Sequence, residues 1–244
     1  MNMDMDMSTG GSVSMGTVGA VLLLVWALVM WAAVAVLWVG SRRPVPGRWY
    51  TAGLAVIGLG VVGQIGHIQE HIAQVGIWVL HPDSPPGMTP WGDALAMGFG
   101  RVDPANKTLG MEILHLVGNF IFLAGLAGVM VVTRRALRTK ARRWARMGTW
   151  MQFVHGLEHL ALTVSVALGA RAIGLSTWFG LLPEGPGLWT YRVWWHFIAN
   201  VVGSVIFAIA LRHLWRERRE IEATFCTGVP EPVATDRREP VPVA

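Results

Sequence analysis

The sequence predicts an all-α membrane protein with five transmembrane helices, of which spans two to five form a four-helix bundle of two parallel two-helix repeats. Composition is the first observation behind this prediction. Charged residues are only 14% of the 244-residue chain and hydrophobic residues are 53%, with a mean hydropathy of +0.46. The apolar residues also come in long runs that meet the ~20 residues a helix needs to cross a bilayer. A polar sequence that occurs twice predicts the internal repeat.

The predicted spans divide the chain into five parts. The spans run from about Thr17 to Val39, Tyr50 to Leu80, Leu109 to Thr133, Trp144 to Ala170 and Tyr191 to Leu211. The parts are an extracytoplasmic tail rich in Met, Asp and Gly (1–16), a peripheral transmembrane anchor (17–40), repeat one (50–133), repeat two (144–211) and a basic, disordered cytoplasmic tail (212–244).

Basic residues alternate between the two sides of the predicted bundle. They follow the first span (Arg42, Arg43, Arg48), the third (Arg134, Arg135, Arg138, Lys140, Arg142, Arg143, Arg146) and the fifth (Arg212, Arg216, Arg218, Arg219). The positive-inside rule places these segments in the cytoplasm and the N-terminus outside. Together with a composition rich in Ala, Val, Arg and Trp, this predicts a multi-pass protein of a bacterial plasma membrane. Topology thus explains the net charge of +5, and the sequence predicts no nucleic-acid partner.

The repeated sequence is Gln-x-x-His-x-x-Glu-His-x-Ala. Its polar residues fall within an arc of about 120° on one face of a helix. Each copy is followed, on the next span, by His-x-x-x-Asn. Repeat one therefore carries Gln64, His67, Glu70, His71, His115 and Asn119, and repeat two carries Gln152, His155, Glu158, His159, His196 and Asn200. Glu112 lies one turn before His115, whereas Val193 holds the matching position before His196, which predicts an asymmetric site.

These residues predict a metal centre inside the bundle. Ionisable groups within a membrane are costly and are usually kept for function, although a hydrogen-bonded network that ties helices together is the alternative. Imidazole and carboxylate ligands suit iron, copper or zinc. The predicted metal ligands are His67, Glu70, His71, His115, His155, Glu158, His159 and His196. The groups predicted to orient them are Gln64, Glu112, Asn119, Gln152 and Asn200.

Three functions fit such a site. The first is a non-haem oxidoreductase acting on a lipophilic substrate or a quinone. The second is electron transfer by haem b, with His115 and His196 as axial ligands. The third is metal-ion transport, or metal binding without catalysis. The sequence identifies no catalytic residue and no oligomeric state.

The five-span layout and the His/Glu motifs resemble uncharacterised actinobacterial multi-span integral membrane proteins with paired histidines in their helices. The resemblance implies an integral membrane protein and brings no activity with it.

Overall fold

Regular structure in the described part of the chain is helical throughout. The computed structural model describes residues 14–82, 84–85, 87–106 and 108–227. These residues form α1 (Met15–Gly40), α2 (Gly47–Leu80), α3 (Pro90–Gly100), α4 (Leu109–Val132), α5 (Lys140–Ala167), the 3-10 turn η1 (Leu175–Thr177), α6 (Pro186–Arg216) and α7 (Arg218–Thr227). The predicted all-α class is confirmed. Most of the predicted outer tail, residues 1–16, and the end of the chain from residue 228 lie outside the described residues.

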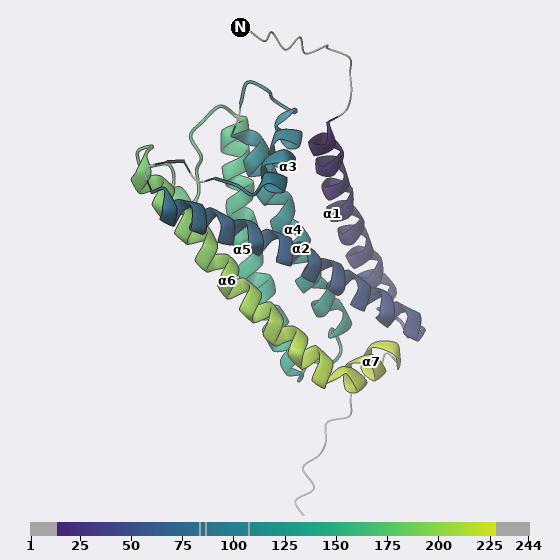
Figure 1. Ribbon diagram of the computed structural model, residues 1–244. Coiled ribbons are helices and arrows are strands. Elements are labelled where there is room, and N and C mark those ends of the chain that lie inside the picture. The colour runs from purple at the N-terminus through teal and green to yellow at the C-terminus, as the bar shows by residue number, and fades with distance from the viewer. Residues whose placement is uncertain (1–13, 83, 86, 107, 228–244) are drawn as a thin grey trace, which may run out of the picture.

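Four long helices form the bundle. Helices α2 and α5 each pack against both α4 and α6, so α2 and α5 face each other across the bundle, as do α4 and α6. Helix α1 lies at the periphery, where it packs on α3 and α4 (Figure 1). The long helices alternate in direction, so the ends of α1, α4 and α6 and the beginnings of α2 and α5 meet at one end of the bundle (Figure 1). We call this the basic end, after its arginines, and the opposite end the outer end.

Helices α1, α2, α4 and α6 are each long and apolar enough to cross a membrane. Helix α5, the predicted fourth span, does not belong to this group. It opens with a basic segment, residues 140–146, and then carries the polar residues of its motif, both of which lower its hydropathy. Beyond Arg146, however, it exposes apolar side chains such as Phe153 and Leu157. A membrane crossing by α5 therefore stays a prediction.

The structure adds one helix outside the predicted spans and corrects the prediction of a disordered tail. The first outer connection contains α3, which has Thr89 as its N-cap, Pro90 at its start and Asp93 in its first turn. The predicted disordered tail, 212–244, is helical through Thr227, because α6 continues to Arg216 and α7 follows. Ile221 and Phe225, four residues apart on α7, are fully buried and attach it to the basic end.

Candidate functional site

Six histidines from four helices form one buried cluster. His67 and His71 come from α2, His115 from α4, His155 and His159 from α5, and His196 from α6, and each is at most 8% exposed. Neighbouring imidazole rings in this histidine cluster have their centroids 4.8–6.5 Å apart. The structure thus brings all six motif histidines together.

The cluster consists of two sets of three imidazoles, one from each predicted repeat. In the first set the ring centroids of His67, His71 and His115 are 4.9, 5.4 and 6.1 Å apart. In the second set those of His155, His159 and His196 are 4.8, 4.8 and 5.7 Å apart. The sets touch through His115 and His159, at 5.7 Å, and through His71 and His196, at 5.9 Å. Corresponding histidines therefore have similar neighbours.

Many ring nitrogens of the cluster lack a conventional hydrogen-bond partner. His67 Nε2 and His71 Nε2 lie 3.1 Å apart, and His71 Nδ1 lies 3.0 Å from Gln74 Oε1. His115 Nδ1 donates to the carbonyl oxygen of Met111 at 2.8 Å, which leaves the lone pair on Nε2. Five buried imidazole nitrogens have no hydrogen-bond partner among the described residues: Nδ1 of His67, Nε2 of His155, both nitrogens of His159 and Nε2 of His196. Buried polar atoms without partners are rare in proteins and call for an explanation.

A layer of four amides lies beneath the histidine cluster, toward the basic end. Gln64 Nε2 donates to Asn200 Oδ1 at 3.3 Å, and Gln152 Nε2 donates to Asn119 Oδ1 at 2.6 Å. Each glutamine thus bonds the asparagine of the other repeat. The two asparagines donate to the backbone carbonyls of His115 and His196, at 2.8 and 3.0 Å. The amides were expected to orient the imidazole rings, but these hydrogen bonds instead hold the histidine backbones and link the helices.

The two motif glutamates bind the outer connections. Glu70 accepts hydrogen bonds from the backbone N–H of Thr89, at 3.0 Å, and from its hydroxyl. Glu158 accepts from the backbone N–H of Ser176 at 2.7 Å and from Trp195 Nε1 at 3.1 Å. Glu158 Oε2 also lies 3.7 Å from His155 Nδ1. The structure therefore does not place these carboxylates between the two histidine sets, where a bridging ligand would lie.

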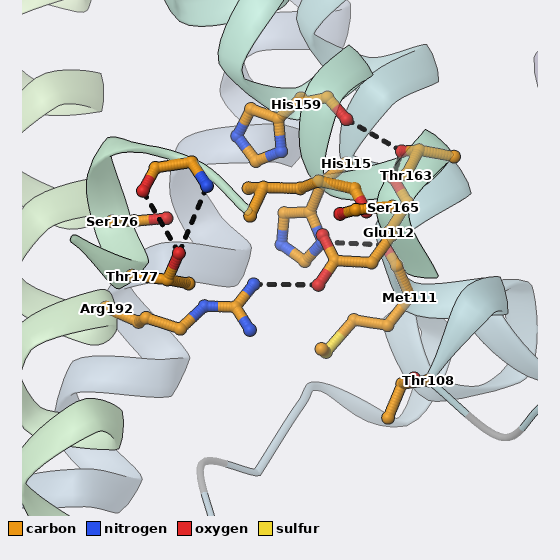
Figure 2. Close-up of polar contacts among 12 residues, drawn as sticks. Thr108, Met111, Glu112, His115, His159, Thr163, Ser165, Ser176, Thr177 and Arg192 are labelled. Carbon is orange, nitrogen blue, oxygen red and sulfur yellow. Dashed lines mark hydrogen bonds and ion pairs between the residues drawn. The ribbon is translucent and has the colours of Figure 1, made fainter. Parts of the chain in front are cut away.

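A buried ion pair stands beside the cluster on the outer side. Glu112 Oε1 accepts from Arg192 Nη2 at 2.7 Å, and Glu112 is 2% exposed. Figure 2 shows the guanidinium of Arg192 reaching toward Glu112, with the rings of His115 and His159 nearby. Arg192 was not among the residues predicted for the site. Arg192 lies four residues before His196 and therefore on the same helix face, and this spacing could have indicated that it belongs to the site.

A cavity of about 430 Å³ leads from the outer end to the cluster. Its walls include Gln74, Glu112 and Arg192 together with apolar side chains of the outer connections, and it reaches His115, His159 and His196. Toward the basic end the bundle is closed below the amides by Phe122, Leu126 and Phe207, which are at most 3% exposed. The histidine cluster is thus approached from one side of the molecule.

Among the described residues, no three His, Cys, Asp or Glu side chains meet as the ligands of one metal ion. The imidazoles pack against one another, with the rings of His115 and His159 nearly parallel at 7°. A metal would require these rings to turn about their soft terminal torsions.

The fold and the cluster define a helical membrane protein with a buried core of histidines. The chain belongs to the family of unknown function DUF6008, which it matches over residues 3–242. No curated protein and no solved structure matches it.

Proposed function

We propose that the histidine cluster is a transition-metal centre built from two adjacent three-imidazole sites, and that the protein is a membrane oxidoreductase. The observation that carries the proposal is the set of five buried imidazole nitrogens without hydrogen-bond partners. A neutral imidazole nitrogen with a free lone pair is the commonest metal ligand in proteins. Four of these five nitrogens belong to the second set and one to the first. Each set contains three imidazole rings, at centroid separations of 4.8–6.1 Å, which would supply the ligands for one ion.

The ligand chemistry favours copper, iron or zinc. With the glutamates bound to the outer connections, the ligands are imidazoles alone, and imidazole suits these three metals. Copper or iron would supply one-electron redox chemistry. The apolar layer of Phe122, Leu126 and Phe207 separates the site from water at the basic end.

The outer cavity fits a substrate of the lipophilic or quinone type. Ligand pockets are typically 300–1,000 Å³, mostly apolar and fitted with a few polar groups. Here Arg192 provides a donor for a substrate carbonyl, and Glu112 fixes the position of its guanidinium.

The haem and transport alternatives fit the geometry less well. A porphyrin needs a flat slot between its axial ligands, but four other imidazoles lie within 6.5 Å of His115, the proposed axial residue. Transport needs a path through the bundle, and the buried Phe122 and Phe207, whose ring centroids are 5.4 Å apart, lie across that path.

The proposal also includes the membrane in which the protein lies and its orientation there. The composition favours a bacterial plasma membrane, and the alternating arginines favour an orientation in which the outer end of the bundle faces out of the cytoplasm. Substrate would then reach the cavity from the extracytoplasmic side.

Metal analysis of the purified protein, combined with its optical spectrum, tests the proposal. We expect bound copper or iron, up to two ions per chain, without a Soret band. His71→Ala and His159→Ala, one in each set, should each weaken metal binding by at least roughly tenfold, since loss of even an outer partner of a ligand costs 10–100-fold. His81→Ala removes an exposed histidine outside the cluster and is the matched control.

Thermal unfolding separates lost ligands from lost structure. Added metal should raise the melting temperature of the wild type and of His81→Ala equally, and should raise that of His159→Ala by less, because only the first set of histidines keeps all its ligands. A Soret band lost in His115→Ala would replace the proposal with the haem alternative. Wild-type protein that binds no metal ion under any of these conditions would overturn the metal centre.

A further inference from the structure

A second cavity, a groove of about 520 Å³, lies on the surface near the basic end, where α5 begins and α6 ends. It is lined by Lys140, Arg143, Trp144, Arg146, Trp150 and His213, together with Met147. The α5 residues recur at intervals of three and four, so they form one stripe along that helix. We call this cavity the basic groove. It is separate from the histidine cluster and plays no part in the proposed redox function.

The basic groove contains three cationic side chains. Lys140, Arg143 and Arg146 are exposed, and within the described residues their side chains form no ion pair or hydrogen bond. Glu217 is the acidic neighbour. Its carboxylate accepts from the backbone N–H groups of Lys140 and Ala141, at 3.2 and 3.0 Å, and lies 3.6 Å from His213 Nδ1. An anion in the groove would therefore be held by the side chains and not by the helix N-terminus.

The basic groove sits where the exposed surface of α5 changes from basic to apolar. Up to Arg146 the exposed positions include Lys140 and Arg143. Immediately beyond it, Met147 is 45% exposed and Trp150 is 65% exposed. Tryptophan is enriched at the membrane–water interface. With α5 crossing the membrane as predicted, this change would put the groove at the level of the lipid headgroups, with an apolar wall that continues toward the hydrocarbon.

We infer that the basic groove binds the phosphate headgroup of an anionic phospholipid. The three cations neutralise the phosphate, and the acyl chain lies along Met147 and Trp150. Basic pockets between transmembrane helices bind anionic headgroups in this way. The charge complementarity and the adjoining apolar wall favour a lipid over a free phosphate ion, which would need only the cations.

Native mass spectrometry of the detergent-solubilised full chain tests the inference. Phosphatidylglycerol, titrated against phosphatidylcholine, should bind selectively at one site per chain. Arg143→Gln/Arg146→Gln should weaken phosphatidylglycerol binding by roughly 30-fold, since each basic residue contributes about a fivefold factor near an anionic headgroup. Both arginines are exposed, so the variant should fold like the wild type. Arg216→Gln/Arg219→Gln removes the same charge at the same end of the bundle, from exposed residues outside the groove, and should bind like the wild type.

Two outcomes would overturn the inference. Equal binding of the two lipids, or equal losses in the two double variants, would mean that the groove does not recognise an anionic headgroup. Inorganic phosphate at millimolar concentration is the second probe. If it displaced phosphatidylglycerol fully and stabilised the wild type as strongly as the lipid does, the ligand would be a small anion and not a lipid.

Discussion

The two motif glutamates show how one residue can position a whole connection. Glu70 binds Thr89, nineteen residues later, and Glu158 binds Ser176, eighteen residues later. Each carboxylate accepts a backbone N–H, a charge-assisted hydrogen bond that is about twice as strong as a neutral one. Each glutamate therefore fastens an outer connection close to the histidines that share its helix. This role explains a buried charge at both positions without a metal.

We expect Glu158→Gln to destabilise the fold by ~1–3 kcal/mol. The amide of glutamine removes the charge, and it leaves a buried N–H donor without a suitable acceptor. Unfolding by SDS titration in mixed micelles would measure the change. Glu184→Gln, which alters an exposed carboxylate in the same outer connection, should have little effect. If Glu158 only anchors the connection, the folded variant should keep the metal content of the wild type. Loss of metal from the folded variant would instead assign Glu158 as a ligand.

At the residue scale, the sequence is a better guide to which side chains lie close together than to the contacts that each of them makes. His67 and His71 lie one turn apart on an apolar helix, and helical periodicity alone places both rings on one face. The partner of Glu70, by contrast, depends on the path of the connection between α2 and α4, and no periodic pattern specifies that path. The pairing of Arg192 with Glu112 was missed for a similar reason, since it joins different helices.

At the element scale, a glycine contact sets the distance between α2 and α4. A Cβ atom added to Gly60 would overlap the Cα of Gly125, so the two backbones pass in direct contact. Gly63, one turn later on α2, faces the side chain of Ile121 in the same way. Small residues at such crossings allow membrane helices to approach closely. Gly60 and Gly63 thus let α2 and α4 pack closely.

Gly60→Ala should destabilise the bundle by about 1–3 kcal/mol, because the added methyl group forces the helices apart. Gly58→Ala is the matched control: it lies on the same helix, and a Cβ there meets nothing within 4 Å. The control should be neutral or stabilising by up to ~1 kcal/mol, since alanine is the better helix former. The midpoints of thermal unfolding in detergent would compare the two. Equal shifts would show that the crossing tolerates a wider separation.

The long helices could be predicted because each contains a long, mainly apolar run of residues. The short helices contain no such run and were not predicted. Helix α3 carries good local signals in Thr89, Pro90 and Asp93, but it lies in a connection whose glycines and prolines favour an irregular chain. The apolar face of α7 is short and contains Ile221 and Phe225. Burial of these two side chains against the bundle holds the helix in position. Its burial depends on tertiary packing that the sequence pattern does not specify.

At the scale of the whole molecule, the bundle is layered along its length. From the outer end come the cavity, the histidine cluster, the amide layer and the apolar layer, and the basic groove lies near the other end. The amide layer joins the two predicted repeats, since Gln64 bonds Asn200 and Gln152 bonds Asn119. Such reciprocal contacts are what a twofold axis along the membrane normal would produce, and they support the predicted repeat. The layers give the molecule one open face and one closed face.

The direction of that open face can be tested with the single cysteine. Cys226 lies in α7 at the basic end, and the proposed topology places it in the cytoplasm. A membrane-impermeant maleimide should label Cys226 in inside-out vesicles and leave it unlabelled in intact cells. Burial, reinforced by Glu222, raises the pKa of the Cys226 thiol. Because the thiolate is the reactive form, labelling should be slow at neutral pH and faster as the pH rises. The assay should therefore be run at mildly alkaline pH.

A cysteine at the opposite end completes the topology test. Glu184→Cys, in a Cys226→Ala background, places an exposed thiol at the outer end of the bundle, beside the cavity. It should be labelled in intact cells, because the proposed topology faces the cavity away from the cytoplasm. If Cys226 were labelled in intact cells and the cysteine at position 184 only in inside-out vesicles, the cavity would open to the cytoplasm. The histidine cluster would then receive its substrate from inside the cell, and the positive-inside assignment would be wrong.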